Sequence, residues 1–247
     1  MKNKKLYLLL VLFVLFINAL HLNAQTVSNP VIYNAYVSGD MNKWAAVIHT
    51  LEKEQPTTLD KKLELASYYY GYIGFLIGAK KPDMAQKYLI NGSLLIDDII
   101  KHWPKNATVY AYKGSFIGFK IALSKFKALT QGGESVANLD KALKIEPHNI
   151  QANIDKGNML FHTPKLFGGD KKLALKYFVH GVNIIEKNKL TDNNWIYLYA
   201  LSLTARTYEY LNQYDNAKLT YEKILRIEPN YKWVKNVLLP ALKTKMK

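Results

Sequence analysis

The chain has 247 residues, a formal net charge of +15 and no cysteine. The absence of cysteine excludes a disulfide framework and a lipid-modified cysteine, so core packing alone must hold the folded chain together. The length is sufficient for a large hydrophobic core in one or two domains.

The first 24 residues have the three-part pattern of a secretory signal peptide. Lys2, Lys4 and Lys5 form a positive region, residues 7–20 are almost wholly apolar, and Ala24 supplies a small residue at a cleavage site. The apolar run is shorter than the ~20 residues of a membrane span. We therefore expect residues 1–24 to be removed and the mature protein to be periplasmic or secreted, without a stable membrane span. An uncleaved amino-terminal anchor is the alternative.

The charge of the mature chain is also informative. Three of the fifteen net positive charges lie in the signal segment, which leaves +12 on the mature chain. A basic surface attracts anionic partners. Export argues against nucleic acid and leaves anionic envelope polymers, lipid headgroups or acidic proteins. The alternative is that lysines on solvated helix faces only keep the protein soluble. The abundance of Lys, Asn, Ile and Tyr fits a bacterial protein from an AT-rich genome.

The sequence contains a recurrent boundary motif. Residues 141–149 and 223–230 are nearly the same, each an apolar helix end followed by an acid, a proline and an asparagine, and their prolines are 82 residues apart. Weaker copies end at Pro56 and near Pro104, and a further boundary without proline falls at residues 189–193. A period of this length predicts an array of structural repeats.

Between these boundaries, apolar residues recur at steps of three and four, which is the period of an amphipathic helix. No stretch reads as paired strands, so we expect an all-α fold of five helix pairs. The predicted pairs span residues 25–56, 57–104, 105–147, 148–192 and 193–229. A last helix from Tyr231 to Lys243 is expected to cap the array, with Trp233 and Val237 facing inward and Pro240 ending or kinking it.

Glycine and aspartate mark the expected turns inside the pairs. Gly39 and Gly169 each precede an aspartate, so glycine can end one helix and the aspartate can cap the next. Residues 132–134, Gly-Gly-Glu, are also predicted to lie between two helices. Gly78 and Pro82 supply a glycine stop and a proline start.

The residues of the last unit resemble the tetratricopeptide repeat family. Ala205 and Ala217 are small where two helices must approach closely, Tyr208 and Tyr221 are large, and Pro229 ends the unit. The resemblance implies a right-handed αα-superhelix, a solenoid in which the first helix of each pair lines a concave groove that binds a protein or peptide.

The other units match this pattern less fully. Gly114 and Gly157 match small positions in the third and fourth units, whereas Trp44 stands where the first unit usually has a small residue. Residues 163–170 form an insertion that contains Gly-Gly-Asp. This insertion is similar to that of exported bacterial repeat proteins such as the T component of tripartite ATP-independent periplasmic transporters.

No pattern in the sequence points to chemistry. The mature chain has five histidines, and no two of them stand at a helical metal-binding step with a glutamate between. The glycine-rich stretches at residues 114–118 and 132–135 follow no strand, and no base and orienting acid accompany them. We therefore expect no catalytic residue, no metal and no cofactor.

The aromatic content points instead to binding. Tyrosine and arginine make good binding anchors because they bury area and keep a polar group. Projecting the family pattern onto the first helices predicts the following residues in the groove: Tyr33, Tyr36, Tyr70, Asn158, His162, Tyr199, Ser202, Arg206 and Tyr210. The leading hypothesis is a non-catalytic scaffold for a protein or peptide partner, which the basic charge suggests is acidic. The alternatives are an accessory subunit of a periplasmic solute-uptake or envelope-assembly system and, less favoured, an enzyme.

Overall fold

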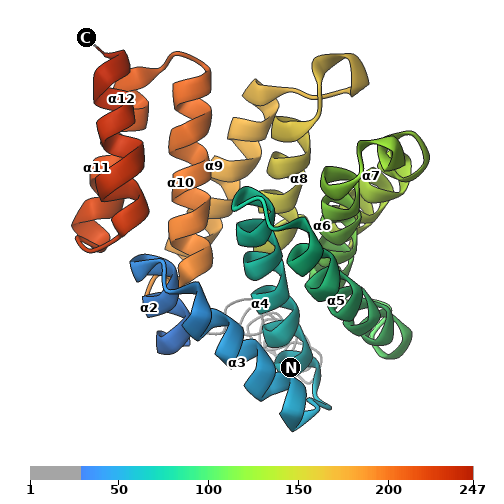
Figure 1. Cartoon of the computed structure of the whole chain (residues 1–247). Helices are drawn as coiled ribbons and strands as arrows, with labels where there is room; N and C mark the ends of the chain where they lie inside the picture. Colours follow the sequence, from blue (N-terminus) through green and yellow to red (C-terminus); the bar gives the residue numbers. More distant parts are fainter. Residues whose placement is uncertain (1–28, 247) are drawn as a thin grey trace, which may run out of the picture.

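The computed structural model describes residues 29–246, and within that range the chain forms helices and no strand (Figure 1). The predicted signal peptide lies outside the described residues. The elements are α2 (Pro30–Ser38), α3 (Met41–Glu54), α4 (Leu59–Gly78), α5 (Pro82–His102), α6 (Ala107–Leu123), η1 (Lys125–Lys127), α7 (Ala128–Ile145), α8 (Ile150–His162), η2 (Lys165–Phe167), α9 (Lys171–Lys187), α10 (Trp195–Tyr210), α11 (Tyr214–Ile227), η3 (Val234–Leu238) and α12 (Leu239–Lys245).

The helices pack as five sequential pairs, α2–α3, α4–α5, α6–α7, α8–α9 and α10–α11, and neighbouring pairs contact one another. This confirms the predicted all-α fold of five helix pairs with a helical segment after the last one. None of the helices in the described part of the chain is long and apolar enough to cross a membrane.

The boundary motif has a local explanation in helix capping. Asn106, Asn149 and Asn194 each precede the first helix of a pair, and their side chains accept hydrogen bonds from backbone amides at 3.0, 2.9 and 3.0 Å. Asparagine is among the best N-cap residues because it satisfies amides that have no partner inside the helix. The repeated asparagine therefore starts each of these pairs.

The expected turns inside the pairs are confirmed at three places, since α4 ends at Gly78 and α5 begins at Pro82 as predicted. Gly39 has φ of +74°, the left-handed conformation that glycine adopts without strain, and ends α2. Asp40 and Asp170 then cap α3 and α9 by accepting from backbone amides at 3.3 and 2.9 Å. The prediction for Gly132 and Gly133 is wrong, because both lie inside α7. The turn occurs earlier in the chain, at Ser124 and η1.

The prediction of which residues of the last helix face inward is wrong. Trp233 and Val237 are 37% and 52% exposed, whereas Tyr231, Val234 and Leu242 are almost fully buried. The helix contains the π-helical turn η3 directly before Pro240 and continues to Lys245. A π turn adds one residue to the turn, so the buried face shifts and the proline's missing amide is accommodated within the helix.

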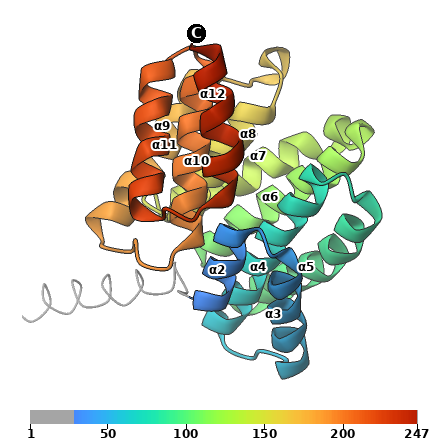
Figure 2. The same cartoon turned by 60° about the vertical axis from the view of Figure 1, so that its left-hand side comes forward.

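The first pair also contacts the last one. α2 lies against α10 in both views (Figures 1 and 2). The Tyr33 hydroxyl donates to Glu228 Oε2 at 3.1 Å, across 195 residues of sequence. Trp44 of α3 and Trp195 of α10 pack edge to face with ring centroids 5.0 Å apart. A single hydrophobic core therefore joins all five pairs.

Candidate partner-binding face

Four first helices contribute polar side chains to one region of the interior. On α8 these are Gln151, Asp155, Asn158 and His162, at steps of four, three and four. Residues at such steps share one helix face. Helix α10 contributes Tyr199, Ser202, Arg206 and Tyr210 at similar steps, and Tyr36 and Tyr70 come from α2 and α4.

Three of these residues form the hydrogen-bonded centre of the region. The Asn158 side-chain amide donates to the hydroxyls of Tyr70 and Tyr199, at 3.1 Å each. The two hydroxyls are 3.5 Å apart. We call Tyr70, Asp155, Asn158 and Tyr199 the inner-face cluster. It joins α4, α8 and α10, which are remote in sequence, and so fixes how the second, fourth and fifth pairs meet.

Asp155 is the unusual member of this cluster. Its side chain is only 1% exposed, and Oδ2 accepts a hydrogen bond from Gln151 Nε2 at 2.9 Å. No ion pair found among residues 29–246 includes it, and Oδ1 is buried without a hydrogen-bond partner in that range. Burial raises the pKa of Asp155 to about 7, although the hydrogen bond from Gln151 acts in the opposite direction. The carboxyl thus holds its proton up to nearly neutral pH, because burial penalises the charged form.

Aromatic rings surround the cluster on the side of the first pair. Tyr36 packs against Trp195 and Tyr231 with ring centroids 5.6 and 5.2 Å apart. Burial raises the pKa of Tyr36 well above its ordinary value, with a further contribution from Tyr231. These rings fill the space between the first pair and the last, so this part of the interior is packed protein.

Nearer the carboxyl-terminal ends of α8 and α10, aromatic and basic side chains reach the surface. Phe161 and Tyr210 pack edge to face at 5.6 Å, and the Lys171 ammonium lies over both rings at 5.0 and 5.3 Å from their centroids. Lys171 also donates to the backbone oxygen of Phe161. Desolvation and the charges of Arg206 and Lys171 lower the pKa of His162. We call Phe161, His162, Lys171, Arg206 and Tyr210 the aromatic–basic rim.

The nine predicted groove residues thus divide into three groups by exposure. Tyr33, Tyr70 and Ser202 are buried at 8%, 4% and 1% exposure, so they pack inside the protein and do not line a surface. Tyr210 is 61% exposed, and His162 is exposed as well. The remaining four are half-buried and form the third group: Tyr36, Asn158, Tyr199 and Arg206.

The sequence reasoning missed Asp155 and Lys171. The signal for Asp155 was available, because it lies one helical turn before Asn158 on the same face of α8. Lys171 offered no comparable signal. It lies at the start of α9, and only the turn that follows α8 brings it over Phe161.

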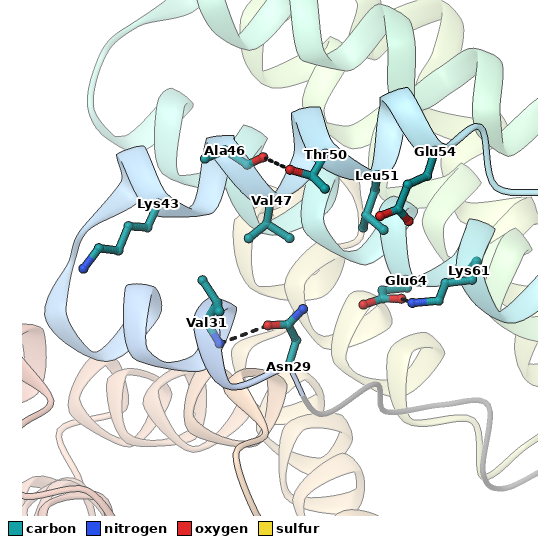
Figure 3. Close-up of a pocket in the computed structure, with 10 residues that line it drawn as sticks. All are labelled: Asn29, Val31, Lys43, Ala46, Val47, Thr50, Leu51, Glu54, Lys61 and Glu64. Atoms are coloured by element: carbon teal, nitrogen blue, oxygen red, sulfur yellow. Dashed lines mark hydrogen bonds and ion pairs between the residues drawn. The ribbon is translucent and has the colours of Figure 1, made fainter.

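A pocket of about 410 Å³ lies elsewhere, between α2, α3 and α4 (Figure 3). Its polar groups are already engaged. The Asn29 side chain caps α2, the Thr50 hydroxyl donates to the Ala46 oxygen, and Lys61 pairs with Glu64 at 2.8 Å. These contacts hold the polar side chains of Asn29, Thr50, Lys61 and Glu64 to the helices that line the pocket.

The structure brings together two histidines that are 32 residues apart in the sequence. His148 Nδ1 and His180 Nε2 are 3.2 Å from each other, and desolvation together with His148 lowers the pKa of His180. Within the part of the chain that the structure describes, no group of three or more potential metal ligands gathers.

The geometry of the last pair agrees with a sequence comparison. Residues 199–231 match the tetratricopeptide repeat. The matched segment covers most of α10, all of α11 and the chain up to Tyr231. No curated protein matches the chain. The last pair is the unit in which the small and large positions of the tetratricopeptide repeat are clearest, with Ala205, Ala217 and Tyr221 fully buried. A tetratricopeptide repeat implies a scaffold for protein–protein interaction.

Proposed function

We propose that this protein is an exported, non-catalytic scaffold that binds a segment of a partner protein at the aromatic–basic rim. The observation that carries the proposal is the stacking of Lys171 over Phe161 and Tyr210 beside the tetratricopeptide repeat. Tyr210 is 61% exposed there, so its ring is accessible to a partner beside the Lys171 ammonium.

The chemistry of the rim favours an acidic segment. Lys171 and Arg206 are cationic, and Arg206 also lies 5.7 Å from the Trp233 ring centroid, so its guanidinium is held next to a partly exposed aromatic surface. Tyrosine and arginine anchors of this kind carry much of the energy of protein interfaces. Because the inner-face cluster is packed, the partner segment contacts the rim and does not penetrate to Tyr70.

The test is partner capture with matched variants. Extracts of the source cells are passed over the wild-type chain, over an Arg206→Ala/Tyr210→Ala variant and over a Lys218→Ala/Leu219→Ala control. Leu219 is 60% exposed on α11, outside the rim. We expect the rim variant to lose proteins that both other baits retain. Identical partners and affinities for all three baits would contradict the assignment of the rim.

Export is tested separately, by the mass of the protein recovered from the cell envelope. We expect the recovered chain to begin at Gln25, because the signal pattern ends at Ala24. Recovery of the full chain from the cytoplasm would contradict export, and recovery of the full chain from the membrane would favour the uncleaved anchor.

A second candidate is an accessory subunit of a periplasmic solute-uptake or envelope-assembly system. It is favoured by the Gly-Gly-Asp insertion after α8, where Gly168 has φ of +89° and Asp170 caps α9. This candidate predicts that transporter or assembly components are encoded next to the gene and copurify with the protein. A gene neighbourhood without such components would count against it.

A further inference from the structure

Two connections in the array expose large apolar side chains. The connection from α6 to α7 carries Phe126, and the first turn of α7 directly after it carries Leu129; these side chains are 86% and 83% exposed. The connection from α8 to α9 carries Leu166 and Phe167, which are 87% and 68% exposed. We call these four side chains the apolar tips. These four are the most exposed large hydrophobic side chains in the described part of the chain, so they contribute little to the core.

Both connections project from the same edge of the array. They follow α6 and α8, the first helices of two successive pairs, and these helices pack against each other. In Figure 1 the turns after α6 and α8 lie at the upper right, and Figure 2 again places them at the upper right of the molecule. The two connections therefore lie on one side of the array, where a single extended surface can reach both.

Three lysines beside the tips, Lys125, Lys127 and Lys165, form no ion pair among residues 29–246. Residues 120–133 contain Lys120, Lys125 and Lys127 and no acid, and residues 156–169 contain Lys156 and Lys165 and no acid. The ion pairs formed among residues 29–246 include Lys156, with Asp140 at 2.6 Å, but not Lys125, Lys127 or Lys165. Each pair of exposed apolar side chains is thus flanked by free positive charge.

The backbone of the connection from α8 to α9 is internally hydrogen bonded. The amides of Phe167 and Gly169 donate to the Pro164 oxygen at 2.9 and 3.1 Å, and the Gly168 amide donates to the Lys165 oxygen at 3.1 Å. A Cβ on Gly169 would lie 1.8 Å from the Thr163 oxygen, so the turn requires glycine there. A connection whose backbone amides already have hydrogen-bond partners can enter a less polar medium without leaving these amides unsatisfied.

We propose that this edge of the array docks on the surface of an anionic phospholipid bilayer. Phe126, Leu129, Leu166 and Phe167 enter the interfacial region, and the flanking lysines contact the headgroup phosphates. Exposed apolar side chains beside lysines without acids are the combination that binds anionic membrane surfaces. Charge complementarity favours the bilayer, because the lysines beside the apolar side chains are cationic and the headgroup phosphates are anionic.

The experiment measures cosedimentation of the purified protein with vesicles. Vesicles of phosphatidylglycerol and phosphatidylethanolamine are compared with vesicles of phosphatidylcholine alone. We expect binding to the first and little to the second. A variant with all four apolar tips changed to serine should bind at least about tenfold more weakly, since each exposed side chain contributes apolar area. A Lys125→Gln/Lys127→Gln/Lys165→Gln variant should lose roughly a hundredfold, at about a fivefold factor per charge.

The control variant is Leu94→Ser/Leu219→Ser. These side chains are 67% and 60% exposed on α5 and α11, outside the tips, so the change removes apolar surface of the same kind elsewhere. It should bind anionic vesicles as the wild type does. Circular dichroism and thermal unfolding establish that each variant is folded. Because the tips pack on nothing, their replacement should not lower the melting temperature.

Insertion is measured by fluorescence quenching with brominated lipids. The Phe126→Trp and Leu166→Trp variants, corrected for the signal of the native tryptophans, should be quenched on anionic vesicles, whereas Leu94→Trp should not. Equal binding of the wild type and the tip variant would overturn the proposal, as would equal binding to phosphatidylcholine or an absence of quenching. Loss of a captured protein by the tip variant, without vesicle binding by the wild type, would assign the edge to a protein partner instead.

Discussion

The first and the last helix pair solve the same packing problem in different ways. In the last pair, α10 and α11 approach through Ala205 and Ala217, both fully buried, so that small residues permit the close contact within the pair. In the first pair, the corresponding region contains Trp44, which is also fully buried. A side chain of this size cannot be accommodated between two closely packed helices of one pair.

The first pair accommodates Trp44 by using its neighbours. The Trp44 indole donates to the Tyr68 oxygen at 2.9 Å, and its ring packs against Trp195. A Cβ on Gly71 would lie 2.5 Å from Trp44 Cζ2, so glycine on α4 makes room for the ring. The close contact has thus moved from the inside of the pair to the contact between pairs. The first pair is therefore tied to α4 and α10 through the Trp44 ring, while in the last pair small residues keep the close contact between its own two helices.

The largest expected effect follows from removing this ring. Trp44→Ala should lower the free energy of unfolding by about 3–5 kcal/mol, because a buried ring is lost and a cavity remains. Urea denaturation followed by circular dichroism measures the loss. The control is Trp233→Ala, whose side chain is 37% exposed and whose loss should be much smaller. Equal losses would mean that the first pair does not depend on Trp44.

Asp155 lies where helix pairs from both halves of the chain meet. Its replacement tests the buried state of this carboxyl through the pH dependence of the free energy of unfolding. The folded state holds the proton up to a pH of about 7, whereas the unfolded chain releases it near 3.8. The folded state therefore binds more protons in this window, so the free energy of unfolding decreases as pH rises from about 4 to about 7. The loss is on the order of 4 kcal/mol at most.

Asp155→Asn should remove this pH dependence and be more stable than the wild type at pH 8. Thermal unfolding from pH 4 to pH 8 measures both effects. Asp140→Asn is the matched control, because Asp140 is an exposed partner of Lys156 at 2.6 Å and its replacement should change stability little. A wild-type curve that does not fall across this window would contradict the buried, uncharged state of Asp155.

Much of the fold could be predicted from the sequence because its signals are local. The five pairs follow from apolar periodicity, and their boundaries follow from proline and from capping asparagine such as Asn149. The small and large positions of the last pair follow from a pattern within about thirty residues, and the same segment matches the tetratricopeptide repeat.

The rest depends on contacts that no local pattern contains. Tyr33, Tyr70 and Ser202 face inward as predicted, but the first pair packs against the last and buries them. Gly132 and Gly133 read as a turn, yet flanking residues with helical preference carry α7 through them, since glycine costs a helix only about 1 kcal/mol. Trp233 and Val237 are exposed because η3 changes the register of the last helix.

In the fourth pair, as in the last one, a small residue permits the close contact between the two helices. Substitutions of two glycines, one at this contact and one inside α7, distinguish the effect of packing from the effect of helix propensity. A Cβ on Gly157 would lie 2.5 Å from Phe178 Cε1, and that ring is fully buried. Gly157→Ala should destabilise the protein by about 1–3 kcal/mol through overpacking. Gly133→Ala meets nothing within 4 Å and should instead stabilise α7 by up to about 1 kcal/mol. Urea denaturation of both variants measures the sign, and the same sign for both would contradict either the contact at Gly157 or the helical position of Gly133.

The smallest expected effect concerns the hydrogen bond between the first pair and the end of the last one. Tyr33→Phe removes the hydroxyl that donates to Glu228 Oε2 and should cost about 1 kcal/mol. A double-mutant cycle with Glu228→Gln isolates the coupling between the two side chains. Tyr214→Phe is the control, because its hydroxyl donates only to Asn212, two residues away on an exposed surface. Additive losses in the cycle would mean that packing of Trp44 and Tyr36, and not this hydrogen bond, joins the two ends. Non-additive losses would mean that the first pair is held to the last by a polar contact as well, so the two ends should unfold in one cooperative step.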